Sequence, residues 1–198
     1  GNTLYGIIFN NSSNNQIGGT TAAQRNVISG NDSYGIYVTG GTNNAIQGNY
    51  VGLGADGLTA VANTSDGILF ASAGTIGGAA LGATNVVSSN GGSGIEFTQS
   101  TGTTAVLGNL VGLAADGATA RGNGAHGVVI ASTQGVQVGD GTAAGRNVIS
   151  GNGGSGISCS AVNAPSHGVI LGNYIGTNAA GTAAVGNSDT GIRVISGA

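Results

Sequence analysis

Apolar residues recur along this chain in short segments that alternate between inward and outward positions. Seven three-residue segments have an apolar residue or cysteine at the first and third positions, whereas the middle residue varies from Ile to Glu to Arg. Successive side chains of a β-strand point to opposite faces, so the outer two residues of each segment are expected to face a core. The seven predicted strands are 7–9, 36–38, 68–70, 95–97, 128–130, 157–159 and 192–194.

Each of the first six strands is followed by two further apolar anchors. The second anchor comes about ten residues later and is usually followed by glycine; its members are Ile17, Ile46, Ile76, Val106, Val138 and Ile170. The third is a pair of apolar residues directly after an asparagine, as in Asn26-Val27-Ile28 and Asn49-Tyr50-Val51. Each unit of the sequence therefore supplies three short strands joined by bends.

The units themselves repeat with one signature, an asparagine followed four residues later by a glycine and then by an apolar residue. Successive asparagines lie 29, 32, 27, 33, 29 and 35 residues apart, so short and long units alternate. Self-similarity at such a period is typical of a solenoid. The sequence predicts an all-β, right-handed parallel β-helix of about six coils of 27–35 residues, with three short strands per coil, and residues 1–198 as one domain.

The recurring asparagine is predicted to form a structural ladder. An asparagine side chain carries both an acceptor and donors, so stacked copies bond to one another and to the peptides of a tight corner. The glycine that follows is expected either to adopt a positive φ or to allow a close approach of neighbouring backbone. The predicted ladder consists of Asn2, Asn31, Asn63, Asn90, Asn123, Asn152 and Asn187.

Composition supports this fold and excludes several functions. Only 6% of the residues are charged, which leaves too few for the polar faces of amphipathic helices. A net charge of -3 without a basic cluster argues against nucleic acid as a partner, and no apolar run is long enough to span a membrane. The single cysteine, Cys159, falls on an inward strand position and is predicted to be a core residue.

The segments IGGTTAAQRNVISGN at 17–31 and GNYIGTNAAGT at 172–182 carry a resemblance to a known family. The chain resembles the right-handed parallel β-helix repeat proteins that occur in large secreted and cell-surface bacterial proteins. This resemblance covers essentially the whole chain and implies a secreted or cell-surface location. Such repeats serve in adhesins, in structural surface layers and in carbohydrate-active enzymes of the pectate-lyase-like superfamily, so the resemblance leaves the activity open.

Two pairs of charged residues are candidates for catalysis. Glu96 and Arg193 are the charged members of the outward row on the first strand, but they lie three coils apart, or about 14 Å. Asp56 and Asp116 occupy equivalent Ala-Asp-Gly turns two coils apart, and turn formation is the favoured role for both. Neither set brings together the acid and base of a glycoside hydrolase or the carboxylates of a calcium site.

The histidines likewise predict no active site. His126 and Asp66 share one repeat position, directly before the strand glycine, but lie two coils or about 10 Å apart. His167 lies near Pro165 in a local insertion and has no evident carboxylate partner. The sequence therefore predicts no catalytic residue, no metal site and no cofactor.

The outward row of the first strand is instead a candidate interaction face. A lone solenoid should present polar residues to solvent, yet this row is mostly apolar. Two interpretations remain open: a neighbouring loop covers the row, or it is an association surface. The candidate face consists of Ile8, Tyr37, Leu69, Glu96 and Val129.

These observations favour a structural role, and they leave a carbohydrate-related role as the alternative. The favoured function is an extracellular module that acts as a rigid spacer, a surface-layer component or a filament subunit, with or without an adhesive role. The alternative is a carbohydrate-binding or carbohydrate-active β-helix whose site lies partly outside this segment, with glycans as partners. The chain begins and stops at the same phase of the repeat. We therefore expect either further repeats of a longer parent or end-to-end stacking of copies.

Overall fold

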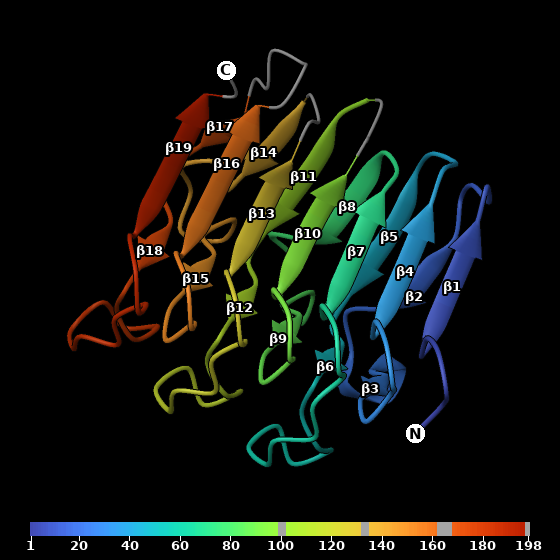
Figure 1. The fold of residues 1–198 in the computed structure, drawn as a ribbon, viewed down its shortest axis with the longest axis horizontal. Coiled ribbons are helices and arrows are strands. Elements are labelled where there is room, and N and C mark those ends of the chain that lie inside the picture. Colours follow the sequence, from blue (N-terminus) through green and yellow to red (C-terminus); the bar gives the residue numbers. More distant parts are fainter. Residues whose placement is uncertain (99–101, 132–134, 162–167, 197–198) are drawn as a thin grey trace.

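The strands wind into a parallel β-solenoid, as predicted (Figure 1). The computed structural model describes residues 1–98, 102–131, 135–161 and 168–196. Along this part of the chain every paired strand runs parallel to its counterpart in the next coil. One 3-10 helix, η1 (Ala22–Gln24), is the only helix found there, and it lies in the first coil.

Three sheets form the walls of the solenoid. The first sheet contains β1 (Ile7–Asn10), β4 (Ile36–Thr39), β7 (Ile68–Ala71), β10 (Ile95–Thr98), β13 (Val128–Ala131), β16 (Ile157–Ala161) and β19 (Ile192–Ser196). The second contains β2 (Gln16–Gly18), β5 (Asn44–Gln47), β8 (Gly74–Gly77), β11 (Thr104–Leu107), β14 (Val136–Val138) and β17 (Val169–Ile170). The third contains β3 (Val27–Ile28), β6 (Tyr50–Val51), β9 (Val86–Val87), β12 (Leu110–Val111), β15 (Val148–Ile149) and β18 (Tyr174–Ile175).

The predicted alternation of inward and outward residues is confirmed in the first sheet. Its register pairs Ile36 with Ile68 and Val38 with Phe70, and all four side chains are fully buried. Phe70 and Phe97 follow one another in the core with ring centroids 6.0 Å apart. Because apolar side chains stack on apolar side chains, the interior is filled without any change of register from coil to coil.

The predicted asparagine ladder is present over all seven members. The side-chain amide of each residue donates to the carbonyl oxygen of the next, at 2.7 to 2.9 Å. Most amides also donate to a carbonyl of the third sheet, as Asn63 does to Ile28. The ladder therefore satisfies backbone groups at the corner between the third and first sheets, which is the role the sequence predicts.

A second ladder, which the sequence analysis missed, occupies the corner between the second and third sheets. Its amides bond in the same pattern at 2.8 to 3.1 Å. Its members are the asparagines that open the third anchor: Asn26, Asn49, Asn85, Asn109, Asn147 and Asn173. Asparagine ladders thus bond successive coils to one another at two of the three corners of the solenoid.

The glycine of the repeat is required for close approach, which decides between the two expected roles. Gly35 does not have a positive φ, but a Cβ atom built on it would lie 2.7 Å from the Gly67 carbonyl oxygen and 2.8 Å from Nδ2 of Asn63. The other strand glycines of the central coils are equally enclosed. Any larger residue would push the corner away from the ladder.

The long coils carry loops at 54–60, 114–120 and 178–184 that project on one side and stack on each other (Figure 1). The Ala115 N–H donates to the Gly57 carbonyl, and the Ala179 N–H donates to that of Gly117. Asp56 and Asp116 form the turns of the first two loops, as predicted, because each carboxylate accepts two backbone N–H groups and a threonine hydroxyl.

Candidate functional site on the outer side of the first sheet

The candidate interaction face is two columns wide, not one. The predicted row is in register from strand to strand, running from Ile8 on β1 to Arg193 on β19. A second column lies beside it, made of the residues that directly precede the strand glycines. Its members are Tyr5, Tyr34, Asp66, Ser93, His126, Ser155 and Thr190. We call the two columns together the outer face.

Exposure along the predicted row is uneven. Ile8 is 48% exposed, whereas Leu69 is only 9% exposed, and Tyr37, Glu96 and Val129 are half-buried. The Tyr37 ring lies against the rings of Tyr5 and Tyr34 from the neighbouring column. Association through this face remains a prediction.

Three tyrosines cluster at the end of the outer face that lies on β1 and β4. The Tyr5 and Tyr34 rings stack with centroids 5.8 Å apart and an interplanar angle of 19°. Tyr37 meets the edge of Tyr5 at 5.2 Å and lies 5.5 Å from Tyr34. Aromatic rings in such contacts stabilise one another and present a rigid, partly apolar surface.

Asp66 and Glu96 form a hydrogen-bonded carboxyl pair in the middle of the outer face. The sequence analysis considered each of these residues with another partner and did not pair them, although they lie on adjacent coils. The Ser93 N–H also donates to Asp66 at 2.6 Å. Burial raises the pKa of both carboxyls, and for Glu96 the negative charge and the hydrogen bond of Asp66 raise the pKa further. The pair therefore favours holding one proton between two carboxyls.

The tyrosine cluster and the carboxyl pair adjoin one another. The pKa of Tyr34 is raised, first by burial and then by the charges of Asp66 and Glu96. Tyr34 is therefore kept in its neutral form, as a hydroxyl that both donates and accepts hydrogen bonds. Flat rings beside carboxyl and hydroxyl groups suit the recognition of a polyhydroxylated ligand, since rings stack on apolar sugar faces and carboxylates accept from hydroxyls.

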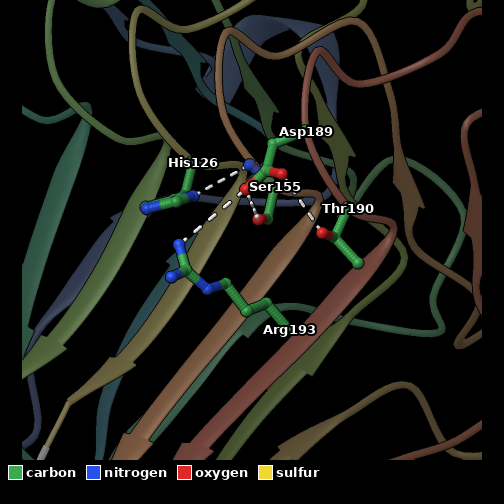
Figure 2. Close-up of polar contacts among 5 residues, drawn as sticks. All are labelled: His126, Ser155, Asp189, Thr190 and Arg193. Atoms are coloured by element: carbon green, nitrogen blue, oxygen red, sulfur yellow. Dashed lines mark hydrogen bonds and ion pairs between the residues drawn. The ribbon is translucent and has the colours of Figure 1, made fainter.

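A separate polar cluster lies at the opposite end of the outer face (Figure 2). The Ser155 hydroxyl donates to the Asp189 carboxylate at 2.9 Å, and the Ser155 N–H donates to Nδ1 of His126 at 2.9 Å. Arg193 pairs with Asp189 at 3.8 Å, and both side chains are half exposed. The Ser155 hydroxyl bond lowers the pKa of Asp189, with smaller contributions from Thr190 and Arg193.

This cluster contains serine, histidine and aspartate but lacks the arrangement of a catalytic triad. In a triad the histidine accepts from the serine hydroxyl and the carboxylate orients the histidine. Here Asp189 accepts the serine hydroxyl instead, and Nδ1 of His126 accepts a backbone N–H. The contacts tie neighbouring coils together and do not activate a nucleophile.

The remaining candidates agree with their predicted structural roles or lie outside the described residues. Cys159 is buried at 8% exposure, and burial raises its pKa. His167 belongs to a part of the chain that the structure does not describe. Across the described ranges no three His, Cys, Asp or Glu residues gather closely enough to hold a metal ion. The same ranges contain no helix long and apolar enough to cross a membrane.

Comparisons with known proteins identify no relative. No protein-family model matches the chain, and no curated protein or solved structure matches it. The solenoid architecture is therefore established by the strand pairing alone. A function can be proposed only from the residues described above.

Proposed function

We propose that this chain is a rigid structural β-solenoid module, a spacer or filament element of a secreted or cell-surface bacterial protein. The observation that carries the proposal is the continuous asparagine ladder from Asn2 to Asn187. A chain with two such ladders resists bending, because each coil is bonded to the next along the sheets and along the corners. Among the described residues no buried side-chain polar atom lacks a partner.

The coil ends support propagation by stacking. On β19 the residues Ile192 and Val194 continue the inward columns, yet they are 42% and 76% exposed. Exposed core positions next to unpaired strand edges favour addition of another coil. We propose that this coil is supplied by further repeats or by a second copy in a head-to-tail contact, which would propagate as a filament.

The test compares two substitutions on one strand. Val194→Asp places a charge in the stacking surface, whereas Ile195→Asp places the same charge on the outward side of β19, opposite Ser160. Light scattering and electron microscopy at increasing concentration should show end-to-end rods for the unmodified chain and for Ile195→Asp, and their loss for Val194→Asp. Monomers throughout, or equal effects of both substitutions, would contradict assembly by coil stacking.

A second candidate function is binding of neutral glycans at the outer face. It is favoured by the tyrosine cluster lying beside the Asp66–Glu96 pair. Titration calorimetry with neutral oligosaccharides checks it, with Tyr37→Ala expected to abolish binding and Tyr174→Ala, the same change on another face, expected to preserve it. Equal losses would show that the effect comes from instability and would count against this function.

A further inference from the structure

Every Asn-Gly dipeptide in this chain belongs to the first asparagine ladder. There are three of them, and they follow one another on successive coils: Asn90-Gly91, Asn123-Gly124 and Asn152-Gly153. The three asparagines are buried, at 0 to 1% exposure, whereas the three glycines are exposed. We call these dipeptides the Asn-Gly rungs.

The packing of one coil on the next explains the glycine in these rungs. A Cβ atom built on Gly91, Gly124 or Gly153 would lie 2.2 to 2.4 Å from a carbonyl oxygen of the preceding coil. No side chain fits at such a distance, so the close approach of the two backbones selects glycine. The fold thereby places a reactive dipeptide inside its own hydrogen-bonding column.

An asparagine followed by glycine is open to deamidation. The glycine nitrogen attacks Cγ of the asparagine, a C–N bond closes a succinimide ring, and the Cγ–Nδ2 bond breaks. The amide group leaves as ammonia together with the proton from the glycine nitrogen. Water then opens the ring at one of its two carbonyls, which gives aspartate or isoaspartate. Glycine favours ring closure because it has no Cβ to obstruct it, and asparagine is accordingly a thermolabile residue.

In the closed solenoid both reacting groups of each rung are held by hydrogen bonds. The Gly91 N–H donates to the Asn63 carbonyl at 2.8 Å, and Nδ2 of Asn90 donates to Oδ1 of Asn123 at 2.9 Å. The other two rungs make the same two bonds at 2.8 to 2.9 Å. Ring closure requires the N–H to leave its acceptor and the side chain to rotate out of the ladder. The reaction therefore requires the corner to open.

The products of deamidation do not fit the ladder. Nδ2 of Asn90 also donates to the carbonyls of Val51 and Ser88, and an aspartate in its place has no N–H to donate. Oδ1 of Asn123 would then face a buried carboxylate oxygen instead of a donor, which is costly in an interior of low dielectric. Isoaspartate adds a methylene to the main chain and shifts the residues that follow. Either product hinders the coil from closing again.

We propose that the Asn-Gly rungs are modification sites that are silent in the closed solenoid and deamidate when a coil opens, so that a transient opening becomes a permanent loss of ladder bonds. The position of each rung sets the order of reaction. Only Asn187 lies beyond Asn152 in the ladder, whereas Asn90 has three rungs on either side. Coils near an end open at a lower free energy than central ones, so Asn152 reacts first and Asn90 last.

The first experiment follows each rung by mass spectrometry after incubation of the whole chain in water enriched in heavy oxygen, which marks deamidation that occurs during the incubation. The chain is kept dilute at pH 8, so that stacking of copies does not cover the last coil. In the folded chain all three rungs should react on the order of 100-fold more slowly than in urea, with Asn152 the fastest. In urea the three rungs should react at similar rates.

Two variants test whether the ladder bond controls the reaction. Asn187→Ala removes the oxygen that accepts from Nδ2 and from the backbone N–H of Asn152, and it leaves the Asn152-Gly153 dipeptide unaltered. It should accelerate deamidation of Asn152 about three- to tenfold and leave the rate at Asn90 unchanged. Asn2→Ala makes the same substitution at the other end of the ladder and should change none of the three rates.

A third variant tests the consequence for stability. Asn152→Asp supplies the aspartate product directly and should lower the urea midpoint of unfolding. Asn178→Asp is its control, because Oδ1 of Asn178 accepts two backbone N–H groups in an exposed loop, a role that a carboxylate oxygen also fills. The proposal is overturned if the rungs react equally fast in the folded chain and in urea. It is also overturned if Asn2→Ala accelerates the reaction of Asn152 as much as Asn187→Ala does, or if Asn152→Asp is as stable as Asn178→Asp.

Discussion

The carboxyl groups of Asp66 and Glu96, on adjacent coils of the solenoid, are hydrogen-bonded to each other on the outer face of the first sheet. Two carboxyls in this position bind a shared proton more tightly than either does in an unfolded chain. The charge state of this pair therefore affects the stability of the fold.

We predict that the pair makes the chain less stable as the pH rises. Both pKa values are raised by folding, so the folded chain binds more protons and stability falls with pH. The loss begins near the ordinary values of 3.8 and 4.5 and continues as the pH passes through the raised values. Urea unfolding from pH 4 upward should show this trend, and Glu96→Gln should flatten it.

Asp56→Asn is the matched control for this pH dependence. Hydrogen bonds to Thr59 and Leu58 lower the pKa of Asp56 to about 2, so its contribution is present above its ordinary value and is lost only as the pH falls toward 2. Above pH 5 this variant should therefore follow the unmodified chain. A Glu96→Gln variant with an unchanged slope would show that the carboxyl pair does not share a proton.

Asn90 tests the contribution of the first ladder to stability. Its amide donates to Asn123, Val51 and Ser88, and its oxygen accepts from Asn63. Asn90→Ala should cost roughly 1 to 3 kcal/mol of unfolding free energy, because buried partners lose their bonds. Asn2→Ala, at the exposed end of the ladder, should cost less. A loss of less than about 0.5 kcal/mol of unfolding free energy in Asn90→Ala would contradict a contribution of this corner to stability.

The strand glycines should tolerate no side chain, although their backbone is not left-handed. A Cβ on Gly94 would lie 2.6 Å from Cγ1 of Val111 and 2.7 Å from the Gly127 carbonyl oxygen. Gly94→Ala should therefore lose about 1 to 3 kcal/mol in denaturant unfolding. Gly186→Ala is the control, since nothing lies within 4 Å of its Cβ position. Equal stabilities of the two variants would show that the corner can move apart.

The strands and the first ladder were predictable because every coil of a solenoid repeats the same local structure. Each coil buries the same positions, so alternation and the asparagine spacing are visible without knowledge of the path between them. The second ladder was equally visible in principle, since Asn26, Asn49 and Asn85 open equivalent segments, but their stacking was not inferred.

Contacts between different columns were not predictable in the same way. Asp66 precedes its strand glycine by one residue, whereas Glu96 follows its own by two, so the pair joins unlike repeat positions. Whether the side chains at these two positions lie on the same side of the sheet depends on how the backbone turns at the strand glycine. A groove on the outer side of the third sheet similarly depends on two departures from the repeat, at Thr84 and Leu110, which line it together only in the folded chain.

Cys159 provides a measure of how tightly the last described coils are closed. The thiol occupies an inward position of β16, paired in register with Val194 of the edge strand β19, and burial raises its pKa. Alkylation requires an accessible thiolate, so both its burial and its raised pKa slow the reaction.

We predict that iodoacetamide labels Cys159 at pH 8 on the order of 100-fold more slowly in the folded chain than in denaturant, because reaction awaits local opening of β19. Val194→Ala removes part of the covering side chain and should accelerate labelling, whereas Ile195→Ala on the outward side of the same strand should not. Mass spectrometry of timed samples gives the rates.

If the folded and denatured chains react equally fast, β19 does not close the core over Cys159. If labelling of the folded chain slows as its concentration is raised, another copy covers this coil, as expected for stacking of one solenoid on the next.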